Sequence, residues 1–106
     1  MAQQLASVSY VMPVLNEERY LRAAVLSIFE QRFAGPVEVI LALGPSTDAT
    51  DAIAAELAAN HPVTLVRNPT GTTSAGLNLA IAAAKYDVVV RVDAHSKLNT
   101  GYTQLA

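Results

Sequence analysis

Short apolar runs alternate along this sequence with segments that carry apolar residues at helical spacing. The runs cover residues 7–12, 37–43, 63–67 and 88–92, and the last consists almost entirely of valine. Neighbouring parallel strands need a connection of helix length, so this alternation is typical of a parallel sheet with helices on its faces. The sequence therefore predicts an α/β fold of three layers, with a mainly parallel sheet and flanking helices.

Turn and capping residues predict where the helices begin and end. Candidate N-caps precede the first two helical segments at Asn16 and at one of Ser46, Thr47 and Asp48, and Thr73 or Ser74 is expected to open the third. Pro13 is expected to end the first strand because it has no N–H to donate. In the second helix, Ile53 and Leu57 are expected to face the sheet, and the third helix is expected to run through Leu77, Ile81 and Ala84. The valine run is expected to be a strand that is buried on both faces.

The size and charge of the chain limit what it can be. With 106 residues, 52% hydrophobic and 15% charged, residues 1–106 are expected to form a single soluble domain with one core. A net charge of −2 without a run of Lys or Arg does not favour nucleic acid as a partner. Cysteine is absent, which leaves neither disulfides nor thiolate metal ligands. No signal peptide or membrane span of about 20 apolar residues is expected, which predicts a cytoplasmic chain.

Asp93 and His95 are the strongest candidates for chemistry. They directly follow the valine run, and open α/β sheets bind their ligands at the carboxyl ends of strands. A carboxylate and an imidazole can bind Mn²⁺ or Mg²⁺ and leave coordination positions for phosphate oxygens and water. By composition alone, Asp93 as a turn cap and His95 as a solvated side chain are the simpler interpretation. Their position after a buried strand favours the metal site.

The loop after the first strand is the second candidate. Its backbone at Val14 and Leu15 can meet a nucleobase or a ribose, while Glu17 can accept a hydrogen bond from a hydroxyl. The alternative is an ordinary strand-to-helix connection that is capped by Asn16.

Two other polar residues lie in apolar surroundings. Asn78 is on a mainly apolar helix and is expected to tie down a neighbouring loop. Arg91 either extends to solvent near the sheet edge or forms an ion pair with a carboxylate or a diphosphate. Segments 46–48 and 68–71 are interpreted as a helix start and a turn. The G-x-G-x-x-G and P-loop motifs do not occur, so dinucleotide and P-loop folds lose their main support.

Four segments carry a resemblance to a known family. They are residues 12–18, which include Pro13-Val14-Leu15-Asn16-Glu17, residues 46–50, residues 68–78, and Val92-Asp93-Ala94-His95. In this order and spacing they resemble the family 2 glycosyltransferases of GT-A fold, and among these the exopolysaccharide enzymes of the succinoglycan-biosynthesis type. The resemblance covers nearly the whole chain and implies a Rossmann-like half domain that binds a nucleotide sugar.

The resemblance also implies site residues and a reaction. Asp93 and His95 fall on the family's Asp-x-Asp motif, which holds a divalent cation, Mn²⁺ or Mg²⁺. The residues implied around the nucleotide are Pro13, Val14, Leu15, Asn16, Glu17, Leu43, Gly44, Asn78 and Asp93. Such enzymes bind a nucleoside diphosphate sugar and let an acceptor hydroxyl displace the diphosphate with inversion at the anomeric carbon.

The chain departs from the family pattern at three places. Leu43 and Gly44 stand where the family usually has two aspartates, so the carboxylate that typically reads the base is missing and uracil specificity is not implied. His95 replaces the second aspartate of the metal motif, which should weaken cation binding and make it depend on a neutral imidazole. Family members also continue into a half that binds the acceptor and carries the catalytic base.

The chain is therefore expected to be a truncated donor-binding half of a glycosyltransferase, inactive on its own in sugar transfer. An acceptor saccharide or lipid-linked saccharide would bind to the missing half, and membrane association of the full-length protein stays open. The alternative is a non-catalytic α/β module for interaction or assembly. In either case a homo-oligomer could cover the exposed sheet.

Overall fold

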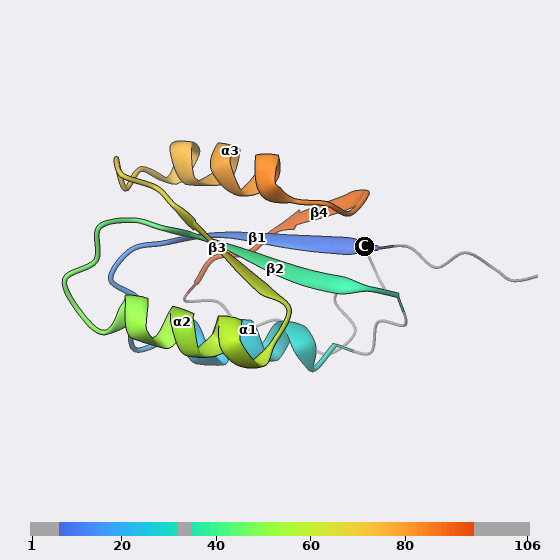
Figure 1. Cartoon of the computed structure of the whole chain (residues 1–106), viewed down its shortest axis with the longest axis horizontal. Coiled ribbons are helices and arrows are strands. Elements are labelled where there is room, and N and C mark those ends of the chain that lie inside the picture. The colour runs from blue at the N-terminus through green and yellow to red at the C-terminus, as the bar shows by residue number, and fades with distance from the viewer. Residues whose placement is uncertain (1–6, 32–34, 95–106) are drawn as a thin grey trace, which may run out of the picture.

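The computed structural model describes residues 7–31 and 35–94, which form a four-stranded sheet in the order β3-β2-β1-β4 (Figure 1). All the strand pairings in this sheet are parallel. The strands are β1 (Val8–Val14), β2 (Val37–Leu43), β3 (Val63–Arg67) and β4 (Val88–Arg91), and the helices are α1 (Leu21–Phe29), α2 (Thr50–Asn60) and α3 (Thr73–Ala83). The predicted parallel α/β fold is confirmed.

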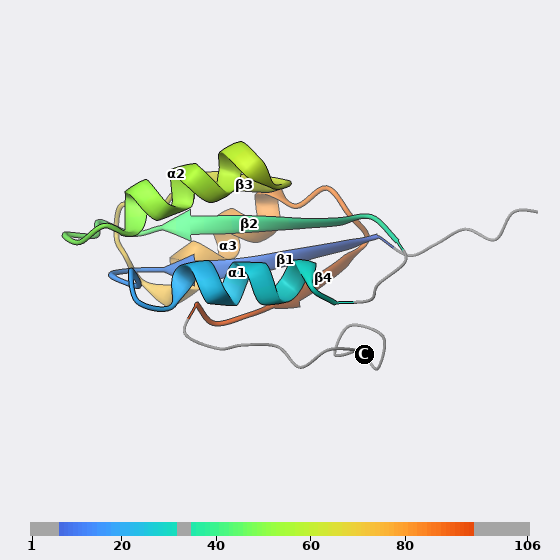
Figure 2. The same cartoon turned by 90° about the horizontal axis from the view of Figure 1, so that it is seen from below.

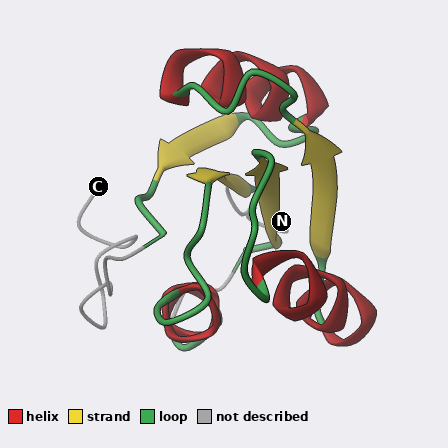
Figure 3. Ribbon diagram, turned by 90° about the vertical axis from the view of Figure 1, so that its left-hand side faces the viewer, coloured by secondary structure: helices red, strands yellow, loops and turns green. Residues whose placement is uncertain are grey.

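The helices form a layer on each face of the sheet. α1 and α2 lie on one face and α3 on the other, which confirms the three predicted layers (Figures 1 and 3). Figure 2, seen from below, shows α1 and α2 side by side in front of the strands, and the two helices contact each other. No helix in the described part of the chain has the length and apolar character to cross a membrane.

Alternating side chains of the strands build a separate core on each face. In β1, Tyr10 and Met12 are fully buried in the larger core, which α1 and α2 cover. Val11, between them, points to the other face and belongs to the smaller core together with Ala80 of α3. The unequal cores follow from two helices on one face and one on the other.

α3 packs on the sheet through its smallest side chains. Gly76 and Ala80 are its buried residues, whereas Ile81 is 50% exposed. A Cβ added at Gly76 would lie 2.8 Å from Asn68 Nδ2 and 3.2 Å from Pro13 Cβ. The helix is apolar on several sides, so periodicity alone could not select the face that allows this close approach.

Pro13 does not end β1, contrary to the prediction. The strand continues to Val14, and Pro13 is in register with Ala42 of β2. Val11, two residues earlier, accepts a hydrogen bond from Val92 on the opposite, β4 side. Pro13 faces that same side beyond the end of β4, so its missing N–H breaks no ladder bond.

α1 and α2 begin later than predicted, whereas α3 begins at Thr73, one of the two residues predicted to open it. α1 begins at Leu21 and α2 at Thr50, and neither N-cap, Tyr20 or Ala49, makes a side-chain capping bond. α3 begins at Thr73 after the N-cap Thr72, whose side chain accepts from the backbone of Ala75. Asn16, the predicted cap of α1, instead bonds to a different loop.

β4 is an edge strand of the described sheet and is not buried on both faces, as the valine run predicted. It pairs only with β1 in that sheet, and Val88 and Val89 are 43% and 41% exposed. A run of valines is compatible with an inner or an edge strand, and the neighbours that distinguish the two are not encoded within it.

A buried carboxylate, that of Glu38, lies near the amino ends of β1 and β2. Glu38, 3% exposed, accepts from Ser9 Oγ at 2.6 Å and from the backbone N–H of Lys85 at 2.9 Å. Ser9 Oγ in turn accepts from the N–H of Tyr86 at 3.2 Å. These bonds attach the α3–β4 connection to β1 and β2.

Candidate functional site

A cleft of about 170 Å³ opens at the carboxyl ends of β1 and β4. Its walls come from the β1 end, the loop that follows it, the β3–α3 connection and the end of β4. The lining residues are Pro13, Val14, Leu15, Glu17, Asn68, Gly71, Thr73, Arg91 and Asp93. Parallel strands end at one common edge, so residues far apart in the sequence meet where such sheets bind ligands.

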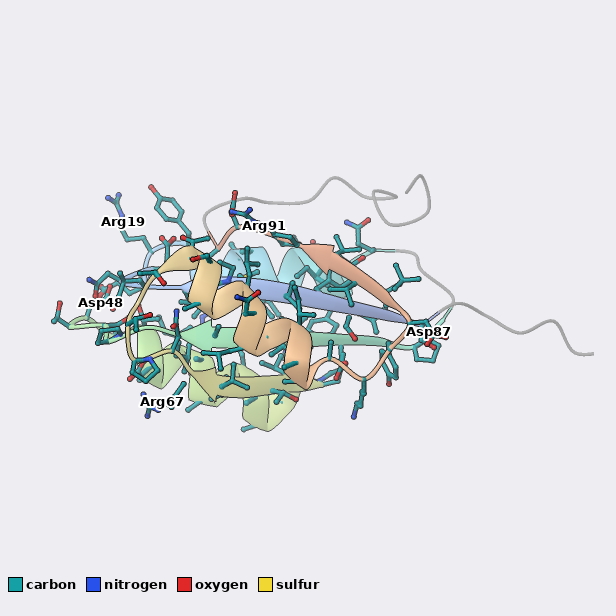
Figure 4. The ribbon with its side chains drawn as sticks, turned by 90° about the horizontal axis from the view of Figure 1, so that it is seen from above. Arg19, Asp48, Arg67, Asp87 and Arg91 are labelled. Atoms are coloured by element: carbon teal, nitrogen blue, oxygen red, sulfur yellow. The ribbon has the colours of Figure 1, made fainter. Side chains whose placement is uncertain are left out.

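A second cleft of about 230 Å³ shares Asn68 with the first. It is lined by Leu43, Gly44, Pro45, Arg67, Asn68 and Pro69. Arg67 is the charged residue in this lining, and it also pairs with Asp51 of α2 at 3.5 Å. Figure 4 shows Arg67 and Arg91 on opposite sides of α3.

Most of the predicted site residues lie at these clefts. The first cleft contains Pro13, Val14, Leu15, Glu17 and Asp93, and the second contains Leu43 and Gly44. Asn16 lies between Leu15 and Glu17 but lines neither cleft. Asn78 is exposed on α3 and also lines neither. The amide that ties down a neighbouring loop is that of Asn68, whose Nδ2 donates to the carbonyl of Thr72 at 2.9 Å.

Asn16 joins the β1 loop, residues 15–20, to the β2 loop, residues 44–49. Its N–H donates to Ser46 Oγ at 2.9 Å, and its Oδ1 accepts from the N–H of Thr47 at 2.8 Å. Its φ of 51° is left-handed, a conformation that Asn tolerates better than most residues. Asn16 is therefore a cross-link between loops and not a helix cap.

Glu17 and Glu18 extend this cross-link towards α2. The N–H of Glu17 donates to Thr50 Oγ1 at 2.8 Å, and Glu18 Oε1 accepts from the N–H of Ala49 at 3.0 Å. The Thr50 hydroxyl also donates to Asp48, which lowers the pKa of that carboxyl from its ordinary value and outweighs the opposing effect of desolvation. An ionised Asp48 thus orients the hydroxyl that positions Glu17 at the cleft.

Two glycines let the loops around the clefts approach closely. A Cβ on Gly44 would lie 3.1 Å from Leu15 Cδ1 and 3.2 Å from the Cα of Gly71. Gly71 has a φ of 72°, which side chains rarely adopt. Larger residues at either position would push the β1 loop away from the β3–α3 connection.

Asp93 forms an ion pair with Arg91 at the mouth of the first cleft. The distance from Arg91 Nη2 to Asp93 Oδ1 is 3.6 Å, and the side chains are 56% and 49% exposed. The ion pair with a carboxylate is one of the two alternatives expected for Arg91. His95, the other predicted metal ligand, lies outside the described residues.

The donor groups at the first cleft suit a cation that binds together with a phosphate ligand. The described residues contain no cluster of three His, Cys, Asp or Glu side chains that could hold a metal ion. Asp93 and Glu17 nevertheless place carboxylates in the lining. Mg²⁺ in nucleotide sites is commonly held by one or two carboxylates, with phosphate oxygens and waters completing its coordination.

Comparison with known sequences identifies the family. Residues 9–104 match the family described as Glycosyl transferase family 2. This chain belongs to glycosyl transferase family 2. The match spans both clefts and confirms the resemblance that the four sequence segments carry.

The curated relatives of this family 2 chain are much longer than it is. The succinoglycan biosynthesis protein ExoA of Rhizobium meliloti (strain 1021) is 34% identical over 97 residues, which cover 89% of this chain and 29% of that protein. An uncharacterized protein of Mycobacterium bovis is 45% identical over 58 residues, covering 55% of this chain and 15% of its own. The chain therefore spans less than a third of the length of these relatives.

Solved structures share the GT-A, Rossmann-like fold. Staphylococcus aureus TarS superposes with a TM-score of 0.82 at 23% identity, covering 92% of this chain and 30% of that one. The mannosyltransferase PcManGT from Pyrobaculum calidifontis, solved with GDP-Man and Mn²⁺, gives 0.80 at 28% identity, covering 95% and 31%. Glucosyl-3-phosphoglycerate synthase from Mycobacterium tuberculosis, solved with Mn²⁺, UDP and phosphoglyceric acid, gives 0.67 at 27% identity, covering 84% and 33%.

Sequence reasoning did not identify three cleft residues of this family 2 chain. Asn68, Gly71 and Thr73 line the first cleft, although their segment was interpreted as a turn and a helix start. Asn68 is 2% exposed, and its N–H donates to the carbonyl of Leu43. An asparagine directly after an apolar strand was the available signal, because it lies at the same sheet edge as Asp93.

Proposed function

We propose that this chain is the donor-binding part of a glycosyltransferase, with the nucleoside diphosphate sugar at the two clefts. The observation that supports this most is the convergence of Glu17, Asn68 and Asp93 on one cleft at the carboxyl edge of the sheet. The alignment with ExoA and the resemblance in fold to PcManGT support the same class of enzyme.

Different residues of the first cleft would contact different parts of a bound nucleotide. Pro13 and Leu15 provide apolar surface for the nucleoside, and Glu17 can accept a hydrogen bond from a ribose hydroxyl. Asp93 and His95 would hold the divalent cation. A cation bound there neutralises the charge of the diphosphate as it leaves.

The base and the sugar of the donor are left open in this proposal. PcManGT was solved with GDP-Man, and the glucosyl-3-phosphoglycerate synthase was solved with UDP. The second cleft is lined by Leu43 and Gly44, which stand where the family usually has carboxylates. We expect its selectivity to depend on Arg67, which offers hydrogen-bond donors to base carbonyl groups.

The remaining parts of the reaction are outside what this chain is proposed to do. We propose transfer with inversion to a saccharide or lipid-linked saccharide that binds outside this chain. The chain spans 29% of ExoA, and on its own we expect it to bind the donor without transferring the sugar.

Replacing Asp93 tests this function. We expect Asp93→Ala to weaken Mn²⁺-dependent binding of UDP or GDP more than tenfold, because the cation loses the carboxylate that is proposed to bind it. Isothermal titration calorimetry of the chain with each nucleotide, with Mn²⁺ and with EDTA, measures this.

Asp87→Ala is the matched control for this experiment. Asp87 is exposed and precedes β4, whereas Asp93 follows it. Figure 4 shows Asp87 and Arg91 at opposite ends of this strand. We expect this variant to bind as the wild type does. Equal binding by the wild type and Asp93→Ala would remove the cation site from the proposal.

An assembly module is the second candidate function, and the edge strand favours it. Val88 and Val89 leave apolar surface on β4, which a second copy of the chain could cover by strand pairing. Analytical ultracentrifugation distinguishes the candidates, since concentration-dependent oligomers without nucleotide affinity would support assembly and overturn donor binding.

A further inference from the structure

Arg91 and Asp93 project from the same side of the β4 end. Alternate residues of an extended segment share a face, and Val92 between them is buried in the larger core. Both charged side chains line the first cleft and pair at 3.6 Å. The guanidinium therefore occupies part of the space around the carboxylate that is proposed to bind the cation.

This ion pair is weak enough to be exchanged. Both partners are about half exposed, and exposed pairs in water contribute little to stability. A divalent cation carries twice the charge of Arg91 and attracts the same carboxylate more strongly. The guanidinium prefers an oxyanion partner with two acceptor oxygens, which a phosphate offers as well as a carboxylate does.

We propose that Arg91 is an internal counterion that is exchanged during donor binding. In the free chain it neutralises Asp93, and when a divalent cation binds Asp93 it releases the carboxylate and pairs with the diphosphate. This inference rests on the proposed donor site and assigns a positioning residue to it. Arg91 thereby weakens binding of the cation alone and favours binding of the cation together with the nucleotide.

The exchange predicts that removing the charge of Arg91 changes the affinity for Mn²⁺ alone and the affinity for a metal-free nucleotide in opposite directions. Without the guanidinium, Asp93 is free for a cation, and the local potential at the cleft, where Glu17 also lies, is more negative. Mn²⁺ alone should therefore bind more tightly. A nucleoside diphosphate without metal should bind more weakly, since it loses a cationic partner. General damage to the cleft would instead weaken both.

The experiment compares Arg91→Gln with the wild-type chain. We expect the dissociation constant for Mn²⁺ alone, measured from the electron paramagnetic resonance signal of the free ion, to fall about two- to fivefold, the scale of an exposed ion pair. We expect the dissociation constant for UDP or GDP in EDTA, measured by calorimetry, to rise by a similar factor. Both changes should shrink at high salt.

Two further variants control for charge and for folding. Arg22→Gln removes an equivalent charge from the exposed Arg22–Glu56 pair between α1 and α2, away from both linings, and should change neither constant. Arg91→Lys keeps the charge and should restore Mn²⁺ affinity close to that of the wild type. Circular dichroism spectra establish that each variant is folded.

The outcomes separate this inference from the function on which it rests. If the wild-type chain binds Mn²⁺ through Asp93 and Arg91→Gln binds it equally or more weakly, the exchange is overturned and the donor site is left intact. Wild-type chain that binds neither UDP nor GDP in the presence of Mn²⁺ overturns both. Tighter Mn²⁺ binding in Arg91→Gln and in Arg22→Gln alike would show a general charge effect and also overturn the exchange.

Discussion

Single hydroxyl and carboxylate groups hold the β1 loop at the first cleft. Thr50 is fully buried, and its Oγ1 accepts from the N–H of Glu17 while its hydroxyl proton is donated to Asp48. The side chain thus links the first turn of α2 to a residue of the cleft lining. Its role depends on the oxygen atom and not on the shape of the side chain.

Replacing Thr50 by valine isolates that oxygen. We expect Thr50→Val to lower the free energy of unfolding by about 1–3 kcal/mol, because the part-buried N–H of Glu17 and the carboxylate of Asp48 each lose a partner. Urea denaturation measures the loss. Thr50→Ser keeps the hydroxyl and should lose less, so equal losses in the two variants would show that the methyl group matters and the hydrogen bonds do not.

Protonation of Asp48 should loosen the same loop. The pKa of Asp48 is lower in the folded chain than its ordinary value of about 3.9, because the Thr50 hydroxyl donates to its carboxylate. The folded chain therefore binds this proton less readily than the unfolded chain does. The stabilisation is complete above about pH 5 and is lost as the pH falls through the lowered pKa.

The urea midpoints of the wild type and Asp48→Asn test this dependence. We expect the wild type to be the more stable of the two at pH 6 and the difference to shrink on acidification below about pH 4. A difference that stays constant between pH 6 and pH 3 would show that Asp48 acts without its charge.

At the scale of the elements, the position of α3 depends on Gly76, which has no side chain. Gly76 brings the helix against Asn68 and Pro13, and both of these residues line the first cleft. The α3 packing and the shape of the cleft are therefore set by one contact. A residue with a Cβ at this position must displace either the helix or the Asn68 amide.

Gly76→Ala should therefore lower the stability of the chain, although replacing glycine by alanine in a helix usually raises stability. In an ordinary helix position alanine is more favourable than glycine by about 1 kcal/mol. Here we expect a loss of about 1–3 kcal/mol in the free energy of unfolding, since the new methyl group overpacks the contact with Asn68. Nucleotide affinity should fall with it. A more stable Gly76→Ala variant, measured by urea denaturation, would mean that α3 can shift without cost.

Over the whole molecule, the positions of elements could be predicted from local sequence. Contacts and exposure that depend on residues distant in the sequence could not. β2 and β3 begin and end where the apolar runs do, because Pro36 and Pro62 precede these runs and Gly44 and Asn68 follow them. Asn16 was assigned to α1, but its partners Ser46 and Thr47 are distant in sequence. The exposure of Val88 depends likewise on which strands lie beside β4.

The candidate site shows the same division. Pro13, Glu17 and Asp93 could be placed at the carboxyl edge because each follows a strand that the sequence reveals. The contribution of Asn68 and the pairing of Arg91 with Asp93 needed the tertiary arrangement. Local sequence therefore located the edge of the sheet that carries the site, while the packing of the loops decided which side chains face one another.

The buried carboxylate of Glu38 joins the amino ends of β1 and β2 to the connection that leads into β4. Its Oε2 accepts from both Ser9 and the backbone of Lys85, so one oxygen holds together segments from the start, middle and end of the described chain. Apolar packing could fill the same space, but it would leave the Lys85 N–H and the Ser9 hydroxyl without an acceptor. Such orphaned buried groups are costly.

Replacing Glu38 should therefore destabilise the whole domain and do so through its acceptor oxygen. We expect Glu38→Ala to lower the free energy of unfolding by about 1–3 kcal/mol for the lost acceptor alone. Glu38→Gln retains an oxygen that can accept from both donors, so its loss should be smaller. Urea denaturation, with hydrogen exchange at Lys85 and Tyr86 to localise the effect, measures both. Equal losses in the two variants would show that the negative charge, and not the acceptor position, holds the α3–β4 connection to the sheet.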